Sequence, residues 1–202
     1  MVGARAVLIW ALFAVAILYP LWAAAQSPLL AWRDAVYIAS GFAGIIGLAL
    51  LLMQPLLAAR FLPGLSAARA RRLHRYTGIA LVAAVIVHVA GLWLTSPPDV
   101  VDALLFASPT AFSAWGVVAM WAVFATALIT LLRRRLKMRW LTWRIGHAAL
   151  GVVIVLGTVV HALLIEGTME TLSKIGMCVV VTAVTGVAMV RLRVWSKRPV
   201  TR

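Results

Sequence analysis

The sequence has few charged residues for its length. Only 12% of its 202 residues are charged and just five are acidic, whereas roughly a quarter of the residues in a soluble domain are charged. A single cysteine, Cys178, excludes a disulfide within the chain and a metal cluster held by thiolates alone. No GxGxxG or Walker motif is present, so any nucleotide chemistry would belong to a partner. These absences argue against a soluble nucleotide-binding enzyme.

Apolar residues dominate what is present. Hydrophobic residues make up 64% of the chain, and the mean hydropathy is +1.04. This composition leaves too little polar surface for a soluble globule, and disorder requires low hydrophobicity. We therefore expect an all-α polytopic membrane protein with a single domain over residues 1–202, because a helix satisfies its own backbone groups in lipid. Six membrane-spanning helices are expected, at about residues 5–25, 36–59, 73–95, 112–132, 143–165 and 173–192.

The charges are divided unequally between the two sides of these helices. With the N-terminus inside, all but two of the 19 Lys and Arg residues fall on the inner side. The outer side holds Arg33, Lys174 and all five acidic residues. The positive-inside rule therefore predicts that both termini are cytoplasmic, in a bacterial-type inner membrane. Orientation and contact with anionic lipid explain most of the basic residues, and nucleic acid is not an expected partner.

The first expected helix has some features of a signal peptide. Arg5, an apolar run and residues 23–26 (AAAQ) resemble a segment that ends in a cleavage site. The apolar run is long for a signal peptide, however, and Tyr19, Pro20 and Trp22 follow it without a polar region. We expect this helix to be retained.

All four histidines lie in two of the expected helices, His74 and His88 in the third and His147 and His161 in the fifth. Fourteen residues separate the members of each pair. At 100° and 1.5 Å per residue, both members lie on one helix face, about 21 Å apart along the axis. The third and fifth helices run in the same direction through the membrane. His74 is therefore expected level with His147 near the cytoplasm, and His88 level with His161 in the outer half.

Further residues repeat at identical offsets in the two helices. An arginine precedes the first histidine by three positions and a glycine follows it by four, giving Arg71 and Gly78 in one helix and Arg144 and Gly151 in the other. Stacked histidine pairs favour two haems, each held from above and below by imidazole. The glycines would let a flat macrocycle approach the backbone, and the arginines suit haem propionates. Two further glycines lie within a turn of the outer histidines: Gly91 and Gly157.

Three alternatives remain open on the residues alone. Histidines within a membrane helix can serve only as hydrogen-bonding partners of another helix. A histidine-lined transporter for metal ions or protons would usually add carboxylates or thiolates along its path, and no acidic residue lies in the middle of an expected helix. A quinol-oxidising cytochrome b-type subunit of a larger complex also uses two histidines on each of two parallel helices, but the sequence shows no clear quinone motif.

Most of the nine tryptophans lie near the ends of the expected helices. Tryptophan is enriched at the interface between membrane and water. We therefore interpret six of them as interfacial anchors: Trp22, Trp32, Trp93, Trp140, Trp143 and Trp195.

The whole pattern resembles the ferric reductase-like transmembrane domain, the superfamily of the NADPH oxidases and metalloreductases. Residues 71–78 (RRLHRYTG) and 142–147 (TWRIGH) carry the resemblance, which covers roughly residues 36–193. It implies six helices bundled around two stacked b-type haems, with His74 paired with His147 and His88 paired with His161 as the metal ligands. It also implies that electrons pass from a cytoplasmic NAD(P)H and flavin module, through both haems, to an acceptor outside.

Larger members of that superfamily attach FAD- and NAD(P)H-binding domains after the sixth helix, whereas this sequence ends at Arg202. It is therefore more similar to stand-alone members, such as the haem-binding membrane subunit of the methionine sulfoxide reductase system. The resemblance implies an oxidoreductase component without its own nucleotide-binding domain. It leaves three donors open: a separate reductase, a free reduced flavin (FMN or FAD) at the cytoplasmic face, or quinol. The acceptor would be ferric iron, oxygen or a periplasmic redox partner.

Overall fold

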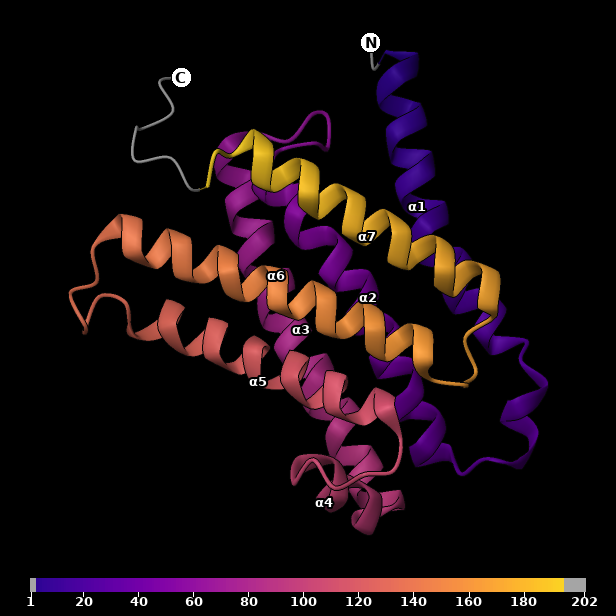
Figure 1. Ribbon diagram of the computed structural model, residues 1–202. Helices are drawn as coiled ribbons and strands as arrows, with labels where there is room; N and C mark the ends of the chain where they lie inside the picture. Colours follow the sequence, from indigo (N-terminus) through magenta and orange to yellow (C-terminus); the bar gives the residue numbers. More distant parts are fainter. Residues whose placement is uncertain (1–2, 195–202) are drawn as a thin grey trace.

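The structure, a computed structural model, describes residues 3–194, and every regular element in that range is a helix. Six of the helices are long and apolar enough to cross a membrane, so the prediction of an all-α chain with six membrane-spanning helices is confirmed (Figure 1). The elements follow in this order: α1 (Ala4–Ala25), the 3₁₀ helix η1 (Pro28–Trp32), α2 (Ala35–Ala58), α3 (Ala67–Thr95), α4 (Pro97–Leu104), α5 (Ala111–Leu132), α6 (Trp140–Leu164) and α7 (Thr171–Arg191).

The ends of the helices differ from the predicted ends in two informative places. α3 begins at Ala67, well before the predicted residue 73, because the side chain of Ser66 caps it by accepting a hydrogen bond from the backbone N–H of Arg69 at 3.3 Å. The short helix α4 lies in the connection between the third and fourth expected helices, where no helix was predicted. Its two prolines, Pro97 and Pro98, lie in the first turn, where a missing N–H costs no helical hydrogen bond.

Five of the long helices form a ring, and α1 lies at its edge. α2 packs along α3, α5 packs along α6, and α7 contacts both α6 and α2. In Figure 1, α5, α6 and α7 lie side by side in front of α2 and α3. The helices that carry the histidines, α3 and α6, belong to different packed pairs and have little direct backbone contact with each other. The interior between α3 and α6 is therefore bridged by side chains.

Two glycines allow the close packing within these helix pairs. A Cβ on Gly91 of α3 would collide with the Oγ of Ser40 in α2. A Cβ on Gly157 of α6 would lie 3.1 Å from both the Cβ of Ala119 and the carbonyl oxygen of Trp115 in α5. Each of these two glycines therefore faces the neighbouring helix of its pair.

The apolar core lies in the middle of the ring and draws on five helices, α2, α3, α5, α6 and α7. It includes Leu81, which lies midway between His74 and His88, and Ile154, which lies midway between His147 and His161. The complete cluster of buried residues is Leu48, Ala49, Leu51, Leu52, Leu81, Ala122, Val123, Ile154, Val155, Met177, Cys178 and Val181. Apolar side chains thus separate the two histidine levels.

The connection between α6 and α7 is fixed by two charged side chains. Glu170 caps α7 by accepting hydrogen bonds from the N–H groups of Leu172 at 2.7 Å and Ser173 at 2.6 Å. Lys174 is buried, and its Nζ donates to the carbonyl oxygen of Ile165, the residue that follows α6, at 2.8 Å. A cation at this position also complements the negative end of the α6 dipole.

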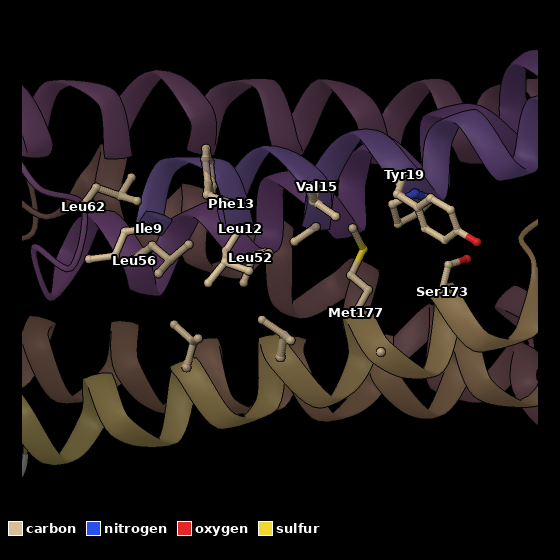
Figure 2. Close-up of a pocket in the computed structure, with 15 residues that line it drawn as sticks. Ile9, Leu12, Phe13, Val15, Tyr19, Leu52, Leu56, Leu62, Ser173 and Met177 are labelled. Atoms are coloured by element: carbon tan, nitrogen blue, oxygen red, sulfur yellow. The ribbon is translucent and has the colours of Figure 1, made fainter. Parts of the chain in front are cut away.

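A groove with a volume of about 520 Å³ lies between α1, α2 and α7, and its lining side chains are drawn in Figure 2. Apolar side chains such as Leu52, Met177 and Phe13 line it, and the hydroxyl groups of Tyr19 and Ser173 lie near one end. None of the four histidines borders this groove. Its lining suits apolar chains and includes no histidine, cysteine or acidic side chain, so the candidate functional site lies elsewhere.

Candidate metal-binding histidine pairs

The four histidines meet as two pairs across the interior of the ring. The ring centroids of His74 and His147 lie 6.1 Å apart, and those of His88 and His161 lie 6.4 Å apart. Both pairs can form only if α3 and α6 run parallel and in register. The structure therefore brings together the same residues that the spacing of the sequence places level with each other.

Backbone hydrogen bonds fix the tautomer of three of these histidines. A carbonyl oxygen can only accept a hydrogen bond, so an Nδ1 bonded to it must carry the proton and Nε2 must keep its lone pair. Most metal-binding histidines have this arrangement, in which one ring nitrogen is anchored by a hydrogen bond and the other binds the ion. The three bonds run from His74 to Gln54 at 3.2 Å, from His88 to Ser40 at 2.8 Å, and from His161 to Phe112 at 2.9 Å.

A glycine exposes the carbonyl group in each outer bond. Ser40 and Gly44 are four residues apart on α2, as are Phe112 and Gly116 on α5. In an α-helix the carbonyl of residue i points towards residue i+4. A Cβ on Gly44 would lie 3.1 Å from Nδ1 of His88. A Cβ on Gly116 would lie 2.7 Å from the corresponding nitrogen of the outer histidine in α6. The outer imidazoles therefore lie in two equivalent cradles, one on α2 beside α3 and one on α5 beside α6.

Neither of the cradle glycines, Gly44 and Gly116, was predicted from the sequence. Glycine is frequent in membrane helices, and 14 occur in this chain. Each glycine leaves room for an imidazole that belongs to another helix. No pattern within α2 or α5 predicts that contact.

The spacing of each pair suits two axial ligands on one metal ion. With a metal–nitrogen bond of about 2 Å, two imidazoles on opposite sides of an ion have ring centroids roughly 6 Å apart. Within residues 3–194, no group of three or more His, Cys, Asp or Glu side chains is arranged to hold a metal ion. Each pair thus offers two nitrogen ligands without further protein ligands, which fits an ion whose remaining ligands come from a planar macrocycle.

The other predicted cofactor-binding residues lie around the pair formed by His74 and His147. A Cβ on Gly78 would make ordinary contact with the side chain of Gln54, and a Cβ on Gly151 would make ordinary contact with Met189. Arg71 is exposed at the start of α3. Arg144 lies with its guanidinium carbon 4.5 Å from the ring centroid of Trp140. The roles predicted for these two glycines and two arginines stay predictions.

Trp143, interpreted from the sequence as an interfacial anchor, has a more specific position. Its indole stacks on the imidazole of His147, with ring centroids 5.2 Å apart and an interplanar angle of 28°. The two residues are four apart on α6, so the sequence did contain a signal for this contact, since residues at i and i+4 share a helix face.

Comparison with known proteins gives one family. The model of the family described as ferric reductase like transmembrane component matches residues 43–158, more than half of the chain. The chain belongs to this family. In this ferric reductase-like chain the matched segment contains His74, His88 and His147, and it stops three residues before His161. No curated protein and no solved structure matches the chain.

Proposed function

We propose that this protein is a transmembrane electron-transfer haem protein with two b-type haems, one held by His74 and His147 and the other by His88 and His161. The observation that carries the proposal is the pairing of imidazoles at two depths of one bundle, with Nδ1 anchored and Nε2 left for an ion in three of the four rings. Membership of the ferric reductase-like family supports transmembrane electron transfer as its use.

Each haem would supply a one-electron couple of its iron. The contribution of the chain is to hold, separate and insulate the two redox sites. The two histidine levels lie about 21 Å apart along the helix axes, from a rise of 1.5 Å per residue. The buried side chains of Leu81 and Ile154 lie between the levels and exclude water from the path. This apolar layer opposes leakage of protons and ions, whereas an electron would cross in two shorter transfers by way of the two redox sites.

We propose that electrons enter at the end of the bundle that carries His74 and His147. Exposed basic side chains from α3 and from the connection before α6 lie at this end, namely Arg69, Arg71, Arg72, Arg75, Arg134, Arg135, Lys137 and Arg139. The positive-inside rule makes this end cytoplasmic and both termini cytoplasmic, in a bacterial-type inner membrane. A basic face attracts an acidic reductase or the phosphate of a flavin, FMN or FAD.

Outward transfer then delivers electrons to an acceptor near His88 and His161. Moving one electron outward is favoured by roughly 2.3 kcal/mol per 100 mV of membrane potential, inside negative. The proposed acceptors are ferric iron, oxygen or a periplasmic redox partner. The protein would act as the membrane subunit of an oxidoreductase whose nucleotide chemistry belongs to a partner.

A reduced-minus-oxidised absorbance spectrum of the purified protein, with the haem-to-protein ratio, tests the proposal. We expect a red protein with about two b-type haems per chain, both six-coordinate and low-spin. A colourless protein, or one haem shared between two chains, would contradict it. A haem-free preparation that transports metal ions or protons in vesicles would instead support the histidine-lined transporter. Reduction by quinol that stops with quinone-site inhibitors would support the cytochrome b-type alternative.

A further inference from the structure

The two histidine pairs are anchored differently. His74, His88 and His161 each donate from Nδ1 to a backbone carbonyl oxygen, at distances between 2.8 and 3.2 Å. The nearest partner of the His147 Nδ1 is the hydroxyl of Thr130 at 3.5 Å, a distance at which a hydrogen bond is weak. His147 is therefore the one histidine among the described residues without a backbone anchor.

Aromatic stacking takes the place of that anchor. The indole of Trp143 stacks on the His147 imidazole at an interplanar angle of 28°, with a centroid distance of 5.2 Å. The guanidinium carbon of Arg133, at the end of α5, lies 4.5 Å from the centroid of the same indole. The cation holds the indole from a second helix, and the indole restricts rotation of the imidazole. Two elements thus fix the ring that no carbonyl fixes.

The indole also presents an unused hydrogen-bond donor. Nε1 of Trp143 is buried and has no hydrogen-bond partner. A buried N–H without an acceptor is costly, so such groups in native proteins usually bond to water, an ion or a ligand. This donor lies one helical turn from His147, where a carboxylate carried by a cofactor between His74 and His147 could accept from it.

We propose that Trp143 is a positioning residue of the inner histidine pair. Its ring face holds His147 with Nε2 towards the bound iron, and its N–H donates to a carboxylate of the same cofactor. This inference rests on the proposed haem function. The inner site depends on Trp143 and the outer site does not, so loss of this side chain should affect only the haem held by His74 and His147.

The test uses the full-length protein in detergent or nanodiscs and compares three variants with the wild type. Trp143→Leu removes the stack and keeps an apolar side chain, Trp143→Phe keeps a ring but removes the N–H, and Trp140→Leu is the matched control. Trp140 is also at the start of α6 and also lies under an arginine, but no contact with a histidine ring is found for it. The readouts are the electron paramagnetic resonance signals of high- and low-spin iron, the haem-to-protein ratio and a redox titration.

We expect Trp143→Leu to convert about half of the low-spin iron to high-spin or to lose it, because one of two sites is affected. Trp143→Phe should stay low-spin and shift the midpoint potential of one haem only. Trp140→Leu should keep both haems low-spin and the wild-type haem-to-protein ratio. Two low-spin haems with wild-type potentials in Trp143→Leu would overturn the inference, as would an equal loss in Trp140→Leu.

If Trp143→Leu fails to fold, unshifted potentials in Trp143→Phe would overturn the donor role of the indole N–H. The stack is then tested by Arg133→Leu, which is expected to raise the high-spin fraction. A wild type without haem would refute the proposed function itself.

Discussion

The imidazole of His161 fills the space that a side chain on Gly116 would need. A Cβ there would lie 2.7 Å from Nδ1 and 2.9 Å from Cε1 of that ring. The same nitrogen bonds to the carbonyl oxygen of Phe112, one turn earlier on α5. One short stretch of α5 thus supplies both the hydrogen bond and the room that fix a histidine of α6.

Substitution of Gly116 by alanine tests this cradle. The added methyl group must displace the His161 ring, and overpacking of this kind costs about 1–3 kcal/mol of stability. We expect Gly116→Ala to lower the melting temperature and the haem-to-protein ratio, with a smaller effect in Gly44→Ala, where the contact would be 3.1 Å. Gly186→Ala is the control because nothing lies within 4 Å of its Cβ position. Wild-type haem content in Gly116→Ala would contradict the cradle.

Single histidine substitutions test the pairing. His88→Ala and His161→Ala should each lower the haem content from about two per chain to about one, because each removes an axial ligand of the same iron. The double variant should lose no more haem than either single variant, whereas His88→Ala with His147→Ala should lose both haems. The measurement is the haem-to-protein ratio after purification in the presence of added haem. Additive loss in the first double variant would show that the two residues serve different cofactors.

The contact between Gly91 and Ser40 predicts a rescue experiment. A Cβ on Gly91 would collide with the Ser40 side chain, so Gly91→Ala should separate α2 from α3 and reduce thermal stability by several degrees, as expected for about 1–3 kcal/mol of overpacking. Ser40→Gly in the same chain removes the colliding side chain, so it should restore part of the lost stability. The backbone carbonyl that His88 uses is unchanged by this substitution. Melting curves of the two single variants and the double variant measure the coupling. Equal melting temperatures for Gly91→Ala with and without Ser40→Gly would contradict the contact.

The capping carboxylate of Glu170 predicts a dependence on pH. Hydrogen bonds from the backbone N–H groups of Ser173 and then Leu172 lower the pKa of this residue below its ordinary value of 4.5. A lowered pKa means that the stabilisation is fully present above the ordinary value and is lost as the pH falls through the lowered one. Glu170→Gln should therefore have a lower melting temperature than the wild type at pH 7, and the difference should shrink in acid. Glu166→Gln removes the same charge from the same connection without removing a cap, and should leave the melting temperature unchanged at both pH values.

Much of the architecture could be predicted from the hydrophobic composition and from the spacing of residues along each helix. Long apolar segments permit only helices in lipid, so the number of helices follows from counting them. The levels of His74 with His147 and of His88 with His161 follow from equal spacing on two helices of the same direction. The start of α3 was missed because its first turns are polar, and hydropathy gives no indication of a helix that continues beyond the apolar segment.

The residues that surround the histidines could not be predicted in the same way. Gly44 and Gly116 act on rings from other helices, and their roles depend on which helices become neighbours. Lys174 was expected among the charged residues of the outer side, yet it is buried against the carbonyl of Ile165, the residue that follows α6. Gly91 and Gly157 face α2 and α5, and their proximity in sequence to His88 and His161 does not give the direction in which they face.

By itself, the sequence determined six membrane helices, their charge asymmetry and two levels of histidine, because hydrophobicity and helical periodicity are properties of single segments. Only the tertiary structure decided that α2 and α5 present carbonyl groups to His88 and His161, and that an indole takes over this task at His147. The physical reason is that an imidazole is oriented by whatever contacts its second nitrogen and its ring face. In this protein three of those contacts come from other helices, and the fourth, from Trp143 on the same helix, depends on how its side chain packs.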